Sequence, residues 1–348
     1  MGSSQISEPG RDPDPIREQP WQPREPFQAR RWLGGGHVQT LASFLAPRRI
    51  DLPAAEERLV EVAPGIKVRC WCRWQSADHA TPLTLIVVHG LEGSSESQYM
   101  LGVARNGLAA GMNVVLMNQR NCGGMNHFAP TLYNSSLSSD VAAVARHMIA
   151  HEGVSHFALA GFSMGGNLVL KLAGEWGENG PSQFQAVAAV CPAMDLAASA
   201  DALHEPANRL YEWYFLVQLF RRMREKAKFF PKDFDVSRLR GISSLRLFDD
   251  RVTAHYCGFT GADDYYYRAA AANVVDHIAV PALVIHAKND PFIRVQPATR
   301  KRILANPNIT YIETDDGGHC AFMGTPDGNG YDGRWAEREL VEFLRRFA

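Results

Sequence analysis

The sequence predicts an α/β domain in which a mostly parallel sheet is covered by helices on both faces and is interrupted by a helical insertion. Strand-like and helical segments alternate over residues 83–190 and again over 281–347, as they do in parallel sheets. Residues 83–88 form a continuous run of β-favouring residues, which is typical of a parallel strand that is buried on both faces. Residues 196–272, between the two alternating regions, contain no clear strand pattern.

The elements follow one another in a regular order. Residues 1–30 contain six prolines among charged residues and predict an extended or disordered arm. Apolar periodicity then predicts strands at 58–62, 67–74, 83–88, 113–117, 157–160, 186–190, 282–285 and 309–312, and helices at about 41–45, 98–109, 138–150, 167–174, 296–305 and 335–347. We therefore expect one sheet-centred core, residues 31–195 plus 273–348, and a helical cap or lid at 196–272.

Composition excludes several functional classes. The 348 residues are 46% apolar and 21% charged, as in ordinary globular proteins. The net charge of −1 argues against nucleic-acid binding. No uncharged apolar run reaches the length of a membrane span, and no signal peptide begins the chain, so we expect a cytoplasmic protein. The six sparse cysteines indicate reduced thiols, and neither metal-ligand spacing nor a cofactor-binding motif is present, so we expect no metal and no cofactor.

The strongest motif is Gly161-Phe162-Ser163-Met164-Gly165. It lies between a predicted strand and a predicted helix, which is the setting of a nucleophile elbow. The two glycines have a steric reason, because a Cβ atom at either place would strike the neighbouring strand or helix. Ser163 would then present its hydroxyl in a cleft above the sheet, so we expect it to be a catalytic nucleophile.

A serine nucleophile needs a base, and the base needs an orienting carboxylate. The order expected with such an elbow is serine, acid, histidine. Asp290 follows the strand at 282–285 and His319 follows the strand ending at Ile312, so both are expected at the same sheet edge as Ser163. Asp195, which follows the strand at 186–190, is an alternative acid.

An oxyanion hole needs two backbone N–H donors. We expect one from Met164, the residue after the nucleophile, and the other from Leu91 in the loop after residues 83–88. In the same loop we expect His89 to buttress the backbone and Glu92 to fix the loop.

Four motifs together resemble one family. They are His89-Gly90-Leu91-Glu92-Gly93-Ser94-Ser95, Asn118-x-Arg120-x-Cys122, Gly161-Phe162-Ser163-Met164-Gly165-Gly166-Asn167 and His286-x-x-Asn289-Asp290-Pro291, preceded by His37-Val38-Gln39-Thr40. This set is similar to the YheT-type branch of the α/β-hydrolases, from about Trp32 to the C-terminus. The resemblance implies an α/β-hydrolase fold and a Ser163–Asp290–His319 triad. It also implies hydrolysis of carboxylic esters, since relatives in that branch cleave acylglycerols and phospholipids.

We therefore expect a cofactor-independent serine esterase or lipase that acts on small-molecule or lipid esters, of short to medium chain length or of the acylglycerol type. Two alternatives stay open at this point. One is an acyltransferase that uses the same acyl-enzyme, and the other is a non-catalytic binding protein with this fold. Sequence determines neither the acyl length, nor the leaving group, nor the oligomeric state.

The expected insertion has three interpretations. Its helix at 210–228 carries an apolar stripe, and residues 221–246 hold nine Lys or Arg against three Asp or Glu. The helix could pack on the core as a cap, or its basic surface could contact anionic membranes. In the third interpretation its aromatic side chains line an acyl-chain pocket; the candidates are Tyr211, Tyr214, Phe215 and Phe220.

Overall fold

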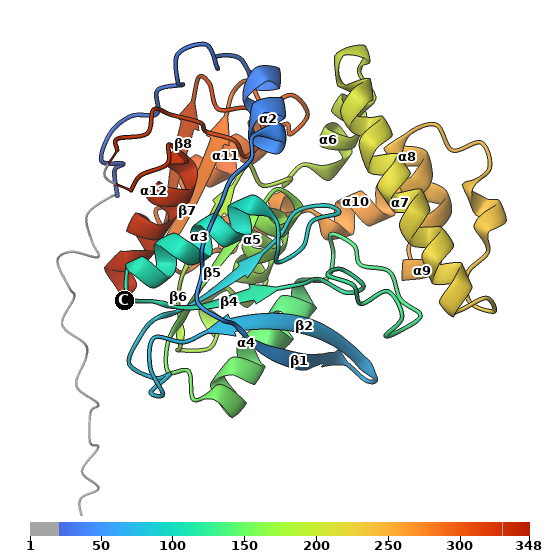
Figure 1. The fold of residues 1–348 in the computed structure, drawn as a ribbon. Helices are drawn as coiled ribbons and strands as arrows, with labels where there is room; N and C mark the ends of the chain where they lie inside the picture. The colour runs from blue at the N-terminus through green and yellow to red at the C-terminus, as the bar shows by residue number, and fades with distance from the viewer. Residues whose placement is uncertain (1–20, 329) are drawn as a thin grey trace, which may run out of the picture.

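The computed structural model describes residues 21–328 and 330–348, which are built around one sheet of eight strands (Figure 1). The strands lie side by side in the order β1-β2-β4-β3-β5-β6-β7-β8. Their bounds are β1 Glu56–Ala63, β2 Ile66–Arg73, β3 Thr84–Val88, β4 Asn113–Met117, β5 Phe157–Phe162, β6 Phe184–Val190, β7 Ala282–Ala287 and β8 Ile309–Thr314. β1 and β2 are antiparallel to their neighbours, and all other neighbours are parallel. The predicted, mostly parallel α/β fold is confirmed.

Residues 85–88 of strand β3 are all apolar because both faces of the sheet are covered there. Leu85 and Val87 belong to the apolar cluster beneath α3 and α12, whereas Ile86 and Val88 belong to the cluster beneath α4, α5 and α11. All four side chains are fully buried, and each such burial stabilises the fold by roughly 1.5–3 kcal/mol. The covering helices are α3 (Gln98–Ala109), α4 (Ser138–Glu152), α5 (Met164–Trp176), α11 (Pro297–Ala305) and α12 (Trp335–Leu344).

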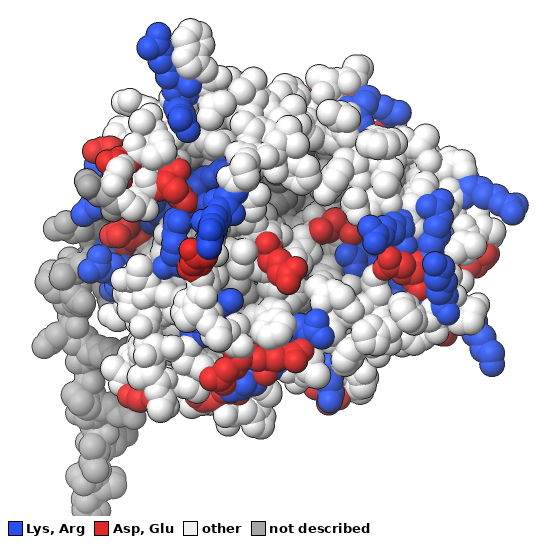
Figure 2. All heavy atoms as spheres, viewed as in Figure 1, with Lys and Arg blue, Asp and Glu red and all other residues white. Residues whose placement is uncertain are grey.

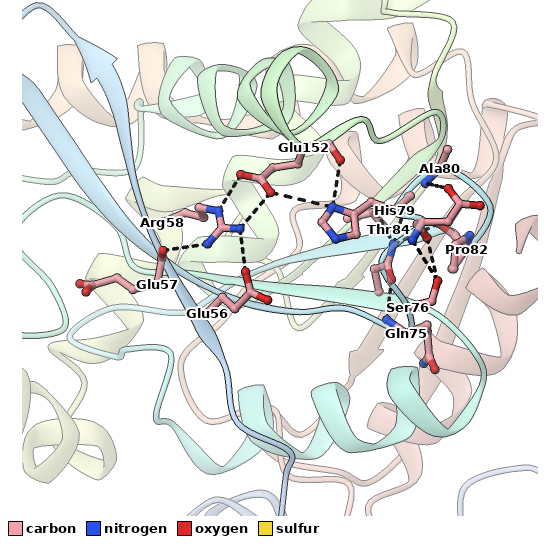
Figure 3. A network of polar contacts seen from close by, with 12 residues as sticks. Glu56, Glu57, Arg58, Gln75, Ser76, His79, Ala80, Pro82, Thr84 and Glu152 are labelled. Atoms are coloured by element: carbon pink, nitrogen blue, oxygen red, sulfur yellow. Dashed lines mark hydrogen bonds and ion pairs between the residues drawn. The ribbon is translucent and has the colours of Figure 1, made fainter.

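An ion-pair network joins the edge strand β1 to α4 (Figure 3). Arg58 of β1 donates hydrogen bonds to Glu152, the last residue of α4, from Nε at 2.6 Å and from Nη2 at 3.1 Å. It also donates to Glu56 at 2.7 Å. Because the Arg58 side chain is 28% exposed, each pair stabilises the fold by at most about 1 kcal/mol. The network fixes the orientation of β1, while apolar burial supplies most of the stability.

The carboxyl ends of the central strands are aligned along one edge of the sheet. Val88 of β3 is paired with Gly161 of β5, Phe162 of β5 with Val190 of β6, and Val190 with Ile285 of β7. Because these residues are in register, the loops that follow β3, β5, β6 and β7 start beside one another. This edge is where ligands bind in open parallel sheets.

Between β6 and β7, residues 191–281 form helices and short helical turns but no strand. The helices are α6 (Leu196–Leu203), α7 (Arg209–Phe229), α8 (Leu245–Phe248), α9 (Ala254–Cys257) and α10 (Ala262–Ala269), and they lie together at one side of the sheet (Figure 1). Leu216, Leu219 and Met223 of α7 are buried in an apolar cluster with Phe248 and Phe292. This cluster joins the helical segment to the loop after β7.

The described part of the predicted arm lies along α12 and contains neither helix nor strand. The Trp21 ring centroid is 6.0 Å from that of Phe343, and the Phe27 ring centroid is 5.6 Å from that of Trp335. Residues 1–20 of the arm are outside the described residues. Across 21–328 and 330–348, no helix combines the length and the apolar composition that crossing a membrane requires.

Candidate active site

Ser163 occupies a sharp turn between β5 and α5. Its φ of 53° is unusual for a residue with a side chain, and such strain is typical of functional positions. A Cβ atom on Gly161 would lie 2.3 Å from the carbonyl oxygen of Gly165, and one on Gly165 would lie 2.2 Å from that of Val88. Only glycine fits at either place. β5 extends two residues further than expected, so Gly161 belongs to the strand and the turn begins at Ser163.

The predicted acid and base are in direct contact. His319 Nδ1 lies 2.8 Å from Asp290 Oδ2, and the other carboxylate oxygen accepts hydrogen bonds from the N–H groups of Phe292 (3.1 Å) and Ile293 (2.9 Å). The Asp290 side chain is fully buried. The hydroxyl oxygen of Thr40, from α2 (Gly36–Leu45), accepts from the backbone N–H of His319 at 2.9 Å.

The charges of this pair stabilise each other. Burial raises the pKa of Asp290, but the His319 charge and hydrogen bond outweigh burial and leave that pKa below its usual value. Burial lowers the pKa of His319, but the Asp290 carboxylate outweighs it and raises that pKa. Asp290 is therefore a permanently charged partner that holds a proton on Nδ1 of the ring.

Ser163 and His319 are not hydrogen-bonded to each other. Among the described residues, the Ser163 hydroxyl has no hydrogen-bond partner, and His319 Nε2 lies 3.9 Å from Cys320 Sγ. In unliganded enzymes such hydrogen bonds are often long and shorten when substrate binds. The structure thus brings the candidate acid and the candidate base into contact, and it places the candidate nucleophile Ser163 at the same sheet edge.

The alternative acid Asp195 and the nearby carboxylate of Asp315 are engaged elsewhere. Asp195 accepts from the Gln296 N–H (2.9 Å) and from the Thr299 hydroxyl (2.7 Å), both at the start of α11. Asp315 pairs with Lys288 at 2.6 Å. None of these carboxylates contacts His319, so the geometry favours Asp290 over Asp195.

The loop after β3 lies against the elbow. A Cβ atom on Gly90 would be 3.2 Å from the Ser163 Cβ, so the backbone of this loop approaches Ser163 closely. Leu91 and Met164 line one cavity together with Ser163. Neither backbone N–H of these two residues has an acceptor in the described part of the chain. Both are therefore available to an oxyanion.

His89 has a structural position beneath this loop. It is fully buried, and burial lowers its pKa to about 4, so the ring is neutral. Its Nδ1 contacts the Gly90 carbonyl oxygen at 2.8 Å, and its Nε2 accepts from the Gln119 N–H at 3.1 Å. The ring thereby ties the loop after β3 to the loop after β4.

Glu92 is held by residues that sequence reasoning did not assign to the site. Arg222 of α7 donates to both Glu92 carboxylate oxygens, from Nε at 2.8 Å and from Nη2 at 2.9 Å. The Tyr133 hydroxyl donates to Glu92 Oε1 at 2.6 Å and accepts from the Glu92 N–H at 3.0 Å. Because Glu92 directly follows Leu91, helix α7 is coupled to a candidate oxyanion donor. Nothing in the sequence near Arg222 indicates its partner.

A mostly apolar cavity extends from Ser163 between the core and the helical segment. Its apolar lining includes Leu132, Leu203, Leu219 and Phe248, and buried Asp249 contributes a polar group. The Tyr266 hydroxyl donates to Asp249 at 2.8 Å. Burial raises the pKa of Asp249 to about 6.

Only one of the four predicted pocket aromatics lines this cavity, namely Phe215. The other three assignments are corrected by the structure. Tyr211 lies beside the cavity, with its ring 5.2 Å from that of Phe292, and Phe220 stacks behind Phe248. Tyr214 is 37% exposed on the outer face of α7. The reason is geometric, since consecutive helical residues point about 100° apart.

Two groups of described residues at the site combine potential metal ligands; one consists of Cys191, His286 and Asp290, and the other includes the candidate base. Potential ligand atoms of Cys191, Cys320 and His319 lie within 4.8 Å of one another. A soft metal could be held there only by occupying the imidazole of the candidate base. All six cysteines are unpaired thiols, as the sequence predicts.

Comparison with known proteins agrees with this architecture. The model of the α/β hydrolase fold family matches residues 84–326. The Escherichia coli protein named "Putative esterase YheT" is 30% identical over 300 residues, which span 86% of this chain and 87% of that protein. Human phospholipase ABHD3 is 27% identical over 300 residues, which span 84% of this chain and 72% of its own.

Solved structures agree on the fold. The Pyrococcus furiosus esterase Pf2001 superposes with a TM-score of 0.55 at 17% identity, covering 86% of this chain and 98% of its own. The two relatives by sequence are named as a putative esterase and a phospholipase, which supports ester hydrolysis as the kind of activity to expect. The chain belongs to the α/β-hydrolase fold family, in the branch that contains YheT.

Proposed function

We propose that this protein is a serine carboxylic ester hydrolase that works through an acyl-enzyme. The observation that carries the proposal is the convergence of a strained serine turn and a buried Asp–His pair at one sheet edge. Ser163 is the nucleophile, His319 is the general base and then the general acid, and Asp290 orients the imidazole.

The reaction follows from these roles. His319 Nε2 takes the Ser163 proton as the hydroxyl oxygen attacks the ester carbonyl carbon. The resulting imidazolium, stabilised by Asp290, gives that proton to the departing alcohol, and the acyl group stays on Ser163. A water molecule then loses a proton to His319 and attacks the acyl carbon, which releases the acid and restores the serine.

The negative charge of each tetrahedral intermediate is stabilised by two backbone donors. We assign these donors to Leu91 and Met164, whose N–H groups have no acceptor within the described residues and which flank Ser163 in the cavity. Each such donor contributes roughly 3–4 kcal/mol to transition-state stabilisation. Met164 is also the first residue of α5, where the helix dipole favours negative charge.

We assign residues 196–272 to a cap and residues 31–195 with 273–348 to the catalytic core. The apolar cavity between the two parts fits an acyl chain, and it supports esters of short to medium chain length or acylglycerols as substrates. The six unpaired cysteines fit a reducing compartment, so we place the protein in the cytoplasm.

Replacement of Ser163 by alanine tests the mechanism. Turnover of p-nitrophenyl esters should fall by about 10⁴-fold or more, and labelling by a fluorophosphonate probe should disappear. Ser199→Ala is the matched control, because Ser199 lines the same cavity outside the elbow. Full activity of Ser163→Ala would contradict the proposal. Product analysis with a competing alcohol separates hydrolysis from acyl transfer.

A further inference from the structure

Large apolar side chains are concentrated on the outer faces of two helices. Fifteen such side chains are exposed in the described residues, and eight of them lie on α2 and on the first half of α7. We call this surface the α2–α7 face; it consists of Val38, Leu41, Phe44, Leu45, Leu210, Trp213, Tyr214 and Val217. The exposed fractions reach 72% at Leu45 and 63% at Trp213. Large contiguous apolar patches on a protein surface are frequently interaction sites.

The two helices present one continuous surface. On each helix the exposed residues recur at steps of three or four, with one adjacent pair (Phe44–Leu45 and Trp213–Tyr214), so they share one side. The Phe44 ring centroid of α2 is 5.4 Å from that of Tyr214 on α7. His37 Nδ1 lies 3.1 Å from the Tyr211 hydroxyl, which joins the helices a second time.

The α2–α7 face adjoins the candidate active site. A chain of ring contacts leads inward, from His37 to Tyr211 at 5.7 Å, to Phe292 at 5.2 Å and to His319 at 4.4 Å. Phe292 also lines the apolar cavity. A molecule bound on this face is therefore close to both the cavity and the base.

The charges around the face fit a lipid surface. α2 contains no Asp, Glu, Lys or Arg, and the only acid between Arg209 and Phe220, Glu212, is 1% exposed. Arg31 lies over the Trp32 ring at 5.0 Å, next to the start of α2. Figure 2 shows a largely uncharged area over α2 and the first half of α7. Exposed aromatic side chains with arginines at the rim are typical of membrane interfaces.

This surface differs from the basic one that the sequence emphasises. Arg222 is bound to Glu92, and Lys226 donates to the backbone carbonyl of Asn126 at 2.8 Å, so both point inward. Other Lys and Arg side chains are exposed over the second half of α7 (Figure 2). The apolar half of α7 is the half that approaches α2 and the active site.

We propose that the α2–α7 face docks on lipid aggregates and delivers ester lipids to the cavity. This inference rests on the proposed ester hydrolysis and adds where the substrate phase is met. A second copy of the chain is the less favoured occupant, because a partner seated here would cover the approach to Phe292 and His319 that a substrate uses.

Vesicle sedimentation tests this proposal with the full chain. Wild-type protein should pellet with phosphatidylcholine vesicles that contain a fifth part of phosphatidylglycerol. The double variant Phe44→Ser/Trp213→Ser should bind about tenfold more weakly, because two exposed rings no longer enter the bilayer. Its hydrolysis of a water-soluble p-nitrophenyl ester should equal that of the wild type, which shows that the variant is folded.

Two controls and one separate variant make the test decisive. Tyr267→Ser removes a ring that is 72% exposed on α10, and it should bind as the wild type does. Arg221→Glu/Arg224→Glu tests the basic half of α7, and it should weaken binding less than the double variant. Ser163→Ala should bind vesicles fully, so loss of catalysis and loss of docking are distinguished.

Three results would overturn the docking proposal. The first is wild-type protein that stays in solution with vesicles, and the second is equal weakening by Tyr267→Ser. The third is wild-type protein that is a dimer by size-exclusion chromatography with light scattering, and that the double variant converts to a monomer.

Discussion

Replacement of Arg222 by methionine should reveal how helix α7 is tied to the loop after β3, which contains the candidate oxyanion donor Leu91. Arg222 is the bidentate partner of Glu92, and the side chains of the two residues are only 12% and 7% exposed. Methionine keeps the aliphatic volume but removes the guanidinium. Glu92 would then be a buried carboxylate whose remaining side-chain donor is the Tyr133 hydroxyl.

The expected cost follows from that uncompensated charge. Breaking a buried ion pair by removing one partner destabilises proteins by about 3–5 kcal/mol. The neighbouring exposed pair sets the scale for comparison. Arg221 is 74% exposed and lies 3.3 Å from Glu225, so Arg221→Met should cost no more than about 0.5 kcal/mol.

Urea unfolding of four proteins measures the effect, namely the wild type, Arg222→Met, Glu92→Gln and the double variant. Neutralising Glu92 removes the buried charge, so the double variant should regain much of the stability that Arg222→Met loses. The coupling free energy should be at least about 2 kcal/mol. Losses that add to within about 0.5 kcal/mol would refute the idea that this pair acts as a unit.

The same variant should also impair catalysis. Glu92 has a φ of 54° and directly follows Leu91, so a released loop moves a candidate oxyanion donor. Loss of one such donor lowers kcat by about 10²-fold or more. Arg222→Met should therefore lower kcat more than it changes KM, whereas Arg221→Met should leave both unchanged.

The remaining predictions concern the elbow and two carboxylates. Gly165→Ala should prevent folding or abolish activity, because its Cβ would lie 2.2 Å from a backbone oxygen. Gly180→Ala is the control and should be tolerated, because the nearest atom to its Cβ would be 3.4 Å away. Circular dichroism and esterase assays check both variants. The buried Asp249 has a pKa of about 6, raised from 3.8 by burial, so its contribution to stability is complete below about pH 4 and is lost as the pH rises through 6. Between pH 4.5 and pH 7 the unfolding free energy of Asp249→Asn should therefore change by about 2 kcal/mol less than that of the wild type. An unchanged pH dependence would contradict the assignment. The Asp290 carboxylate raises the pKa of His319, and the base must be neutral to act, so kcat/KM should rise with pH through that raised pKa. Asp290→Asn should move this rise to lower pH and should lower the kcat/KM reached at high pH.

Local sequence features were enough to predict most of the fold and the residues at the centre of the candidate site. Glycines at 161 and 165 mark the elbow because backbone approach leaves no room for a Cβ, and this constraint appears directly in the sequence. The positions of Asp290 and His319 after predicted strands were enough to place them at the same edge, because parallel strands end on the same side.

Contacts between residues far apart in the chain could not be predicted from sequence patterns. Arg222 and Glu92 are 130 residues apart, and Thr40 meets His319 across 279 residues. Charge pattern alone presented Arg222 as one of several basic residues on a helix surface. Tertiary packing turned that helix so that this arginine faces the loop after β3.

The apolar residues of α7 likewise separate what periodicity predicts from what tertiary packing decides. Their abundance indicated a helix with much apolar surface, and Leu216 and Leu219 do pack inward. The sequence assigned Tyr214 to the pocket, yet it faces outward beside Phe44. Periodicity shows that a helix has faces, whereas only the placement of α2 and of the core decides which face is covered.

By itself, then, the sequence determined the α/β architecture, the elbow and the identity of the acid and base candidates, because sterics and strand order act over short stretches or through regular topology. Only the tertiary structure decided the Glu92–Arg222 tie, the true lining of the cavity and the exposed α2–α7 face. These depend on how segments more than a hundred residues apart are oriented when they meet, and no local pattern encodes that orientation.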